Sequence, residues 1–310
     1  MIAVTSFGYL GPVGTFTQAA LTAWVAAEGQ PHVPFTSVDK ALTAVRSGEI
    51  DAAMVPIENS VEGAVSATLD ALNTGDPLAV VGEVLVPITF VLAVRPGVRR
   101  EDVLAVGTHP HGWAQVRGWM GANLPGAVHV PTLSTAAAAS DLGHGARGGY
   151  QAAVCAPVAA AAAGLEVLAE DIGDRTGAVT RFVLVGRPGE LPEQTGADKT
   201  TVVIYQYDDH TGGLLELLEQ FAARGINISR LESRPTGEVM GRYCFSVDFE
   251  GHVRDARVGE ALSGLRRVAA DVRFLGSYPR ADRRPASVQQ TATDAAFTDA
   301  QQWLAGLRRT

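Results

Sequence analysis

The sequence predicts an α/β protein with a two-lobed first domain and a smaller second domain. Three observations carry this prediction. Short apolar runs alternate with helix-like segments over residues 1–186. A stretch rich in proline, glycine and charge, residues 187–199, then interrupts the pattern as a linker. Strand and helix signals resume over residues 200–278 in the order βαββαβ, which is the ferredoxin-like pattern. Residues 279–310 form a tail that starts polar and basic, and a last amphipathic helix is expected there over Asp294–Leu307.

Composition narrows the class of protein. The chain has 310 residues, of which 46% are hydrophobic, so each of two or three units can bury a core. A net charge of −8 disfavours a general nucleic-acid or membrane-surface binder and leaves small anionic substrates open. The amino terminus lacks the basic start and apolar core of a signal peptide, so we expect a cytoplasmic protein. Cys155 and Cys244 stand in apolar runs, which favours buried thiols over a disulfide or a metal site.

The first lobe opens with a strand, turn and helix. We expect a strand over Ala3–Gly8, a turn over residues 11–18 and a helix running towards Ala27. Because helix amino termini favour negative charge, Thr15 and Thr17 are candidates for holding a carboxylate or phosphate. The alternative is a plain strand-to-helix turn. The glycine spacing does not match a dinucleotide fingerprint, and the phosphate-loop lysine is absent, so no cofactor is predicted.

A second group of polar residues follows a buried strand. Further elements are expected at Val33–Phe35 (strand), Val38–Arg46 (helix) and Ala52–Val55 (strand), in an alternation that suggests a parallel sheet. Glu58, Asn59 and Ser60 come after the last of these, at the carboxyl edge where open α/β sheets bind ligands. Alternatively, Asn59 or Ser60 only caps the next helix.

The chain should enter a second lobe near residues 76–90 and return near residues 170–182. Within that lobe Ser134 and Thr135 precede an alanine-rich helix, where they make a natural cap and a second anion site. His109 and His111 raise the question of a metal, but no companion cluster accompanies them, and we predict none.

The return to the first lobe carries the strongest functional signal. Residues 174–182 place hydroxyls, a guanidinium and a glycine ahead of an apolar strand, with Thr180 and Arg181 where an irregular loop enters the sheet. Arginine holds carboxylates bidentately, and a neighbouring threonine can donate to an oxygen that gains charge. The alternative is an exposed arginine beside a residue favoured in strands.

Together these segments resemble one enzyme family. The sequences Gly-Pro-Val-Gly-Thr-Phe-Thr (11–17), Pro-Ile-Glu-Asn-Ser (56–60), Ser-Thr (134–135) and Thr-Arg-Phe (180–182) are similar in order and spacing to prephenate dehydratase. Residues 212–218 and Glu-Ser-Arg-Pro (232–235) resemble its regulatory ACT domain. The chain departs from the family pattern at Gly177 and Ala178, where asparagine is usual, at His111, where glutamine is usual, and at Gly213, where alanine is common.

The resemblance implies a bilobal, periplasmic-binding-protein-like domain that converts prephenate to phenylpyruvate in L-phenylalanine biosynthesis. It also implies a homodimer or homotetramer with feedback inhibition by L-phenylalanine. Thr180, Arg181 and Glu58 would be catalytic, and the substrate-binding set would be Thr15, Thr17, Asn59, Ser60, Ser134, Thr135 and Phe182. The effector would contact Gly212, Gly213, Leu214 and Asn227, with Glu232, Ser233 and Arg234 from the facing strand of a neighbouring chain.

Four alternatives remain open at this point. A prephenate decarboxylase would remove CO2 and keep the hydroxyl, and an arogenate dehydratase would take a substrate with an amino group in place of the keto oxygen. A two-lobed α/β domain also binds ligands without chemistry, as a sensor. The second domain could serve dimerisation alone.

Overall fold

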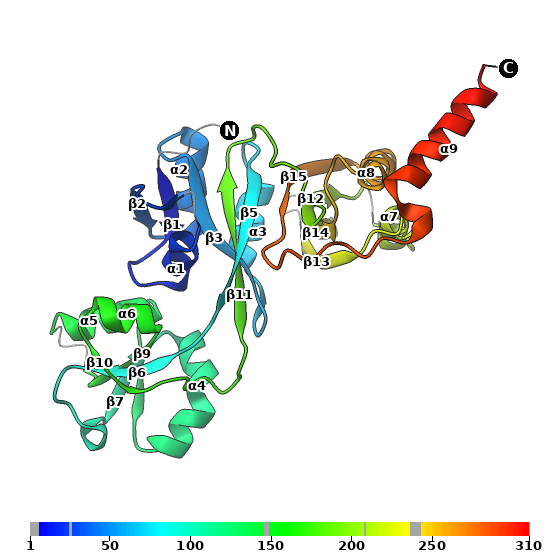
Figure 1. The fold of residues 1–310 in the computed structure, drawn as a ribbon. Coiled ribbons are helices and arrows are strands. Elements are labelled where there is room, and N and C mark those ends of the chain that lie inside the picture. Colours follow the sequence, from blue (N-terminus) through cyan, green and yellow to red (C-terminus); the bar gives the residue numbers. More distant parts are fainter. Residues whose placement is uncertain (1–5, 25–26, 146–148, 208, 236–242, 310) are drawn as a thin grey trace. The chain divides into compact units, whose positions relative to one another are not determined.

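The computed structural model describes residues 6–24, 27–145, 149–207, 209–235 and 243–309 (Figure 1). The chain forms two compact units. The large unit contains residues 2–71 and 84–183, and the carboxyl-terminal unit contains residues 72–83 and 184–310. The chain passes from one unit to the other within helix α3 (Ser66–Asn73) and within strands β5 (Ala79–Pro87) and β11 (Val179–Gly186).

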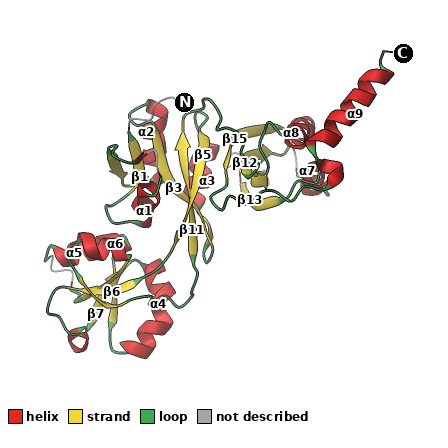
Figure 2. Cartoon of the chain, in the orientation of Figure 1, coloured by secondary structure: helices red, strands yellow, loops and turns green. Residues whose placement is uncertain are grey.

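The first lobe of the large unit is built on a six-stranded sheet, in the order β2-β1-β3-β11-β5 with β4 beside β3. Strand β1 pairs in parallel with both β2 and β3. The remaining elements are β1 (Phe7–Leu10), α1 (Phe16–Thr22), β2 (His32–Phe35), α2 (Val38–Ser47), β3 (Ala52–Asn59), β4 (Gly63–Ala64) and α3 (Ser66–Asn73). Figure 2 shows these helices beside the strands.

Helix α2 shows how local sequence specifies an element. The Ser37 hydroxyl accepts a hydrogen bond from the Lys40 backbone N–H at 3.2 Å, which satisfies one of the unpaired donors of the first turn. Gly48 ends the helix in the left-handed conformation, with φ of 80°, which glycine adopts without steric cost. Between these caps Val38, Leu42 and Val45 recur at helical spacing and are buried, so one face of the helix packs into the core.

The second lobe contains a five-stranded mixed sheet in the order β10-β6-β9-β7-β8. Strand β7 runs parallel to β8 and β9, whereas β6 runs antiparallel to β9 and β10. The parallel arrangement predicted from the alternation therefore holds for part of each sheet. The elements are β6 (Val91–Val94), η2 (Arg100–Asp102), β7 (Ala105–Thr108), α4 (Pro110–Asn123), β8 (Val128–Pro131), α5 (Thr135–Gly143), β9 (Ala152–Cys155), α6 (Pro157–Ala162) and β10 (Glu166–Ala169).

The carboxyl-terminal unit has the predicted βαββαβ order. Its antiparallel sheet runs β13-β14-β12-β15. The elements are β12 (Asp198–Tyr205), α7 (Gly213–Ala222), β13 (Ile228–Pro235), β14 (Tyr243–Glu250), α8 (Ala256–Val268), β15 (Asp271–Pro279), η3 (Gln290–Ala292) and α9 (Asp294–Leu307). Alternate residues of the strands, such as Val202, Ile204, Val247 and Phe249, form a buried core with Leu217 and Phe221 of α7.

Several element boundaries differ from those expected. Strand β1 begins at Phe7, while the earlier part of the expected strand, Ala3–Thr5, lies outside the described residues. Helix α1 ends at Thr22. Strand β3 continues through Asn59, so it includes residues that were expected to follow it. In the described part of the chain, no helix combines the length and apolar character needed to cross a membrane.

Candidate active site

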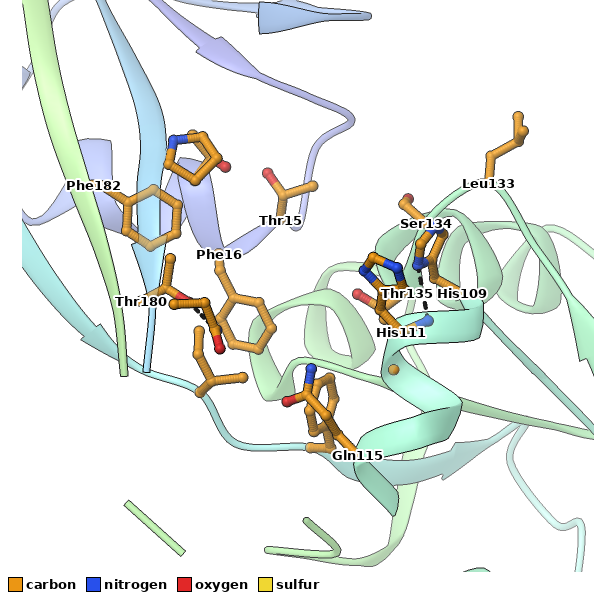
Figure 3. Close-up of a pocket in the computed structure, with 16 residues that line it drawn as sticks. Thr15, Phe16, His109, His111, Gln115, Leu133, Ser134, Thr135, Thr180 and Phe182 are labelled. Atoms are coloured by element: carbon orange, nitrogen blue, oxygen red, sulfur yellow. Dashed lines mark hydrogen bonds between the residues drawn. The ribbon is translucent and has the colours of Figure 1, made fainter. Parts of the chain in front are cut away.

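The large unit contains a pocket of about 300 Å³ between its two lobes (Figure 3). Thr15, Phe16, Thr180 and Phe182 lie on one side of the view, and His109, His111, Ser134 and Thr135 lie on the other. The full set of lining residues is Thr15, Phe16, Thr17, Pro56, Asn59, Ile88, Phe90, His109, His111, Gly112, Gln115, Leu133, Ser134, Thr135, Thr180 and Phe182.

Thr180 presents its hydroxyl to the pocket from strand β11. Because side chains alternate along a strand, Thr180 and Phe182 share the face that lines the pocket. The Thr180 oxygen accepts a hydrogen bond of 2.7 Å from the Asn59 side-chain nitrogen, and the residue is only 7% exposed. With that lone pair occupied, the hydroxyl proton is directed away from Asn59. The hydroxyl can therefore donate to an acceptor other than Asn59.

Asn59 is itself held firmly. Its side-chain oxygen accepts from the backbone N–H groups of Val61, at 2.8 Å, and Glu62, at 3.0 Å. These bonds form an asparagine turn at the end of β3, and they leave the amide nitrogen facing Thr180. The orientation of Asn59 thus follows from the local backbone, and it determines the orientation of the Thr180 hydroxyl.

Three predicted site residues lie off the pocket lining. The side chain of Arg181 lies on the opposite face of β11 from Thr180, where its Nη1 is 3.6 Å from Oε2 of Glu58. Glu58 likewise precedes Asn59 on β3 and points to the other face. The Ser60 hydroxyl accepts from the Val179 backbone N–H at 3.0 Å and so joins β3 to β11. None of these three side chains contributes to the pocket wall.

Helix α1 begins at the pocket through a turn that requires glycine. Gly14 has φ of 85°, and an added Cβ would lie 3.1 Å from the Cα of Ala159, so this turn passes close to α6. The Thr15 hydroxyl caps α1 by accepting from the Gln18 N–H at 3.3 Å, and donates to the Leu10 carbonyl at 3.1 Å. Thr15 therefore reaches the pocket mainly as the start of a helix with free N–H groups.

Helix α5 begins at the opposite wall. The Ser134 hydroxyl accepts from the Ala137 N–H at 2.9 Å, which makes Ser134 the N-cap, and Thr135 follows in the first turn. Both residues line the pocket. The remaining N–H groups of this first turn and the helix dipole favour a negatively charged group here.

The pocket also contains residues that the sequence did not assign to it. His109 caps α4 by accepting from the His111 N–H at 3.2 Å, and burial lowers the pKa of His109, aided by the nearby His111. Gln115 follows one turn later on α4. The available signal was their place directly after a buried strand, β7, at the edge where ligands bind. Among the described residues, no group of three or more histidine, cysteine and carboxylate side chains is arranged to hold a metal.

Apolar side chains form part of the pocket lining. Phe16 and Phe90 pack edge to face with ring centroids 5.9 Å apart. Ile88, which is buried, joins them from the segment after β5, where its N–H donates to the Ala178 carbonyl at 2.7 Å. A molecule in this pocket would meet hydroxyls, helix amino termini and hydrocarbon.

The predicted effector residues lie at two ends of the carboxyl-terminal sheet. Gly212, with φ of 88°, precedes α7 beyond the carboxyl end of β12. Tyr205 at that end pairs with Cys244, which pairs with Arg234, so Arg234 lies at the same end. Asn227 lies at the other end, where its carbonyl accepts from the Glu250 N–H. Within one chain, Asn227 is therefore separated from Gly212 and Arg234 by the length of the sheet.

The fold and site define a class of protein: a two-lobed α/β domain with a pocket between its lobes, linked to a ferredoxin-like domain. Comparison with known proteins identifies the family within that class. The model of the family described as prephenate dehydratase matches residues 7–190, and the ACT domain model matches residues 200–267. The chain belongs to the prephenate dehydratase family, which confirms the resemblance seen in the sequence.

Individual relatives agree over nearly the full length. A prephenate dehydratase of Amycolatopsis methanolica is 48% identical over 99% of both chains. The crystal structure of an Arthrobacter aurescens prephenate dehydratase in complex with L-Phe is 55% identical, with a TM-score of 0.94, and covers 98% of this chain and 100% of that one. A solved structure described as GqqA, a quorum quenching acylase, is 29% identical with a TM-score of 0.80 over 90% of this chain and 100% of that one.

Proposed function

We propose that this chain catalyses the decarboxylating dehydration of prephenate to phenylpyruvate and is inhibited by L-phenylalanine. The observation that carries the chemistry is the Thr180 hydroxyl, which lines the pocket and whose oxygen accepts from Asn59, so that its own proton is left to donate to a bound molecule. It lies opposite the amino terminus of α5, in a chain that belongs to the prephenate dehydratase family.

The reaction needs a donor more than a nucleophile. Prephenate loses CO2 from the ring carbon as the electron pair moves into the ring and the hydroxyl leaves from the opposite carbon. Aromatisation drives the reaction, but hydroxide leaves slowly unless it receives a hydrogen bond or a proton. Thr180 would supply a hydrogen bond to the leaving oxygen, with the proton itself coming from water, because a threonine hydroxyl is too weak an acid to give up its own.

The two carboxylates require anion sites, and the pocket offers them at its edges. Of the lining residues, only His109 and His111 can carry a positive charge, so helix amino termini must provide much of the attraction. We assign one carboxylate to the Ser134 and Thr135 end of α5. The departing carboxylate would lie nearer Phe16 and Phe90, since a less polar place favours its loss as CO2.

Arg181 and Glu58 would act through the backbone. Their side chains pair on the far face of the strands that carry Thr180 and Asn59. An ion pair in that place supports the alignment of β11 against β3. This location favours a positioning role for both residues, with Ser60 joining the same two strands.

We place the L-phenylalanine site between two copies of the chain, which makes the active form a homodimer or a homotetramer. Strand β13 is an edge strand of its sheet. Antiparallel pairing of two such edges across a twofold axis would bring Asn227 of one copy towards Gly212 and Arg234 of the other. The site would then combine Gly212, Gly213 and Leu214 with Glu232, Ser233 and Arg234 of the same copy and Asn227 of the second copy. The chain would work in the cytoplasm, as expected of a biosynthetic enzyme.

An ultraviolet assay of the purified protein with prephenate, with identification of the product, tests this proposal. Phenylpyruvate formation that L-phenylalanine suppresses supports both parts. A non-aromatic keto acid would instead identify a decarboxylase. Absence of turnover on prephenate would contradict the proposal and direct the search to arogenate, to an acyl amide of the kind suggested by the acylase relative, or to a sensor role. Phenylpyruvate formation that is indifferent to L-phenylalanine would leave the second domain with dimerisation alone.

A further inference from the structure

We propose that Glu62 is a positioning residue for the reaction, which holds helix α4 against the turn that orients Thr180. This inference rests on the proposed function, because it assigns Glu62 a role in placing the donor for that chemistry. Glu62 lies in the turn between β3 and β4, in the first lobe. Helix α4 belongs to the second lobe. The contact therefore joins the two lobes at the pocket within the large unit.

Both oxygens of the Glu62 carboxylate are occupied by α4. Oε1 accepts from Nε2 of Gln115 at 3.0 Å, and Oε2 lies 3.0 Å from Nδ1 of His111. His111 and Gln115 are four residues apart, so they lie on one face of the helix and reach the same carboxylate. Both of them also line the pocket. The first turns of α4 carry a partial positive charge that favours the carboxylate further.

The same turn leads directly to the proposed donor. The Glu62 backbone N–H donates to the Asn59 side-chain oxygen at 3.0 Å, and the Asn59 nitrogen donates to Thr180 at 2.7 Å. A displacement of Glu62 therefore displaces one of the two bonds that hold the Asn59 amide. Closure of α4 onto Glu62 would in this way fix the direction of the Thr180 hydroxyl.

The side chains of Glu62 and His111 are exposed, so their contact can serve positioning while contributing little to the stability of the fold. The His111 side chain is 70% exposed and that of Glu62 is 37% exposed. Exposed ion pairs stabilise a fold by about 0–1 kcal/mol. Loss of the contact between Glu62 and His111 should therefore leave the free energy of unfolding almost unchanged.

The test uses the full-length enzyme with Glu62→Ala, Glu62→Gln, Gln115→Ala and the double variant Glu62→Ala/Gln115→Ala. We expect Glu62→Ala to lower kcat about tenfold, the loss that results when about 1.4 kcal/mol of positioning is removed, with Tm unchanged. Glu62→Gln retains an acceptor for Gln115 and should recover most of the rate. If the two residues act through one contact, the double variant should be no slower than Glu62→Ala.

Glu101→Ala is the matched control, because Glu101 is an exposed carboxylate of the second lobe that pairs with Arg99 at 2.7 Å away from the pocket lining. It should leave kcat, KM and Tm unchanged. Full kcat in Glu62→Ala, or a fall that Glu62→Gln does not relieve, would overturn the inference. Wild-type inactivity on prephenate would refute the proposed function without testing the role of Glu62. In that case the crystal structure of Glu62→Ala tests the inference. An Asn59 amide that keeps its contact with Thr180 would overturn the inference, and a reoriented amide would support it.

Discussion

Replacing Thr180 by valine removes the proposed donor while keeping a β-branched side chain of nearly the same shape. Thr180 is 7% exposed, and the apolar side chains of Ile88, Phe90 and Phe182 line the same pocket, so the hydroxyl acts where water competes little. Removing one placed donor from such a site lowers kcat by about 10²–10³, or roughly 3–4 kcal/mol of transition-state stabilisation. We expect that loss in kcat, with a small change in KM, since the donor acts mainly on the developing hydroxide.

The neighbouring contact gives this prediction a second, separate readout. Thr180→Val leaves the Asn59 side-chain nitrogen without its 2.7 Å acceptor. An unsatisfied buried donor costs about 1–3 kcal/mol of stability. Asn59 is only partly buried and lines the pocket, so a fall in Tm at the lower end of that range should accompany the loss of rate. Thr180→Ser retains the oxygen and should keep both the Tm and most of the rate.

Steady-state kinetics with prephenate and thermal unfolding of the three proteins provide the measurement. Phenylpyruvate formation is followed by its ultraviolet absorbance, and the variants are compared at the same protein concentration. A Thr180→Val enzyme that turns over at close to the wild-type rate would refute the assignment of Thr180 as donor. A Thr180→Ser enzyme as slow as the valine variant would show that the methyl group and its packing, and not the hydroxyl, limit the reaction.

Three further predictions concern the rest of the chain. Lys199→Met should destabilise the carboxyl-terminal unit by about 3–5 kcal/mol, as measured by thermal unfolding. The substitution leaves the Glu83 carboxylate buried without the Lys199 ammonium, which lies 2.9 Å from it in the wild type. Cys155 should resist maleimide at pH 8 in the native protein and react only after denaturation, because burial raises the pKa of its thiol to about 12; mass spectrometry counts the adducts. Gly276→Ala should destabilise by more than about 1 kcal/mol, because φ is 132° and the added Cβ would collide with the Val80 carbonyl; chemical denaturation measures this.

The Lys199 prediction has its own control and contrary outcome. Arg266 pairs with Asp271 on the surface of the same unit, with both side chains more than half exposed, so Arg266→Ala should change stability by less than about 1 kcal/mol. The Glu83→Leu/Lys199→Met double variant should recover much of the lost stability, because it replaces the buried pair with apolar groups. Equal stability of Lys199→Met and the wild type would contradict the role given to this pair.

Periodicity predicted most of the architecture. The βαββαβ order of residues 200–278 follows from the alternation of apolar positions, and α9 begins and ends at the predicted residues, Asp294 and Leu307. Caps explain much of this success, since Ser37, Ser134 and Thr293 each accept from a first-turn N–H of the helix that follows. Such signals depend on neighbouring residues alone, so a sequence contains them in full.

The bounds of strands β3 and β11 decide which site residues face the pocket, and the sequence did not show those bounds. Pro56 suggested that the third strand ends before Glu58, yet β3 continues to Asn59, and β11 already includes Thr180 and Arg181. Because neighbours on a strand point to opposite faces, Asn59 and Thr180 enter the pocket whereas Glu58 and Arg181 pair behind it. A list of polar residues in one segment cannot separate these two faces without the boundaries of the strand.

The sequence by itself determined the fold class, the family and the segments that carry the site, because hydrophobic period, turn residues and motif order are properties of the linear chain. Only the tertiary structure brought α4 to the turn after β3, with Gln115 and Glu62 fifty-three residues apart in sequence and 3.0 Å apart in space. Contacts of that kind depend on how two lobes pack, and no local pattern records them. The Thr180 hydroxyl likewise depends on its contact with Asn59, 121 residues away in sequence, and so the donor could be named from the sequence but oriented only in the folded protein.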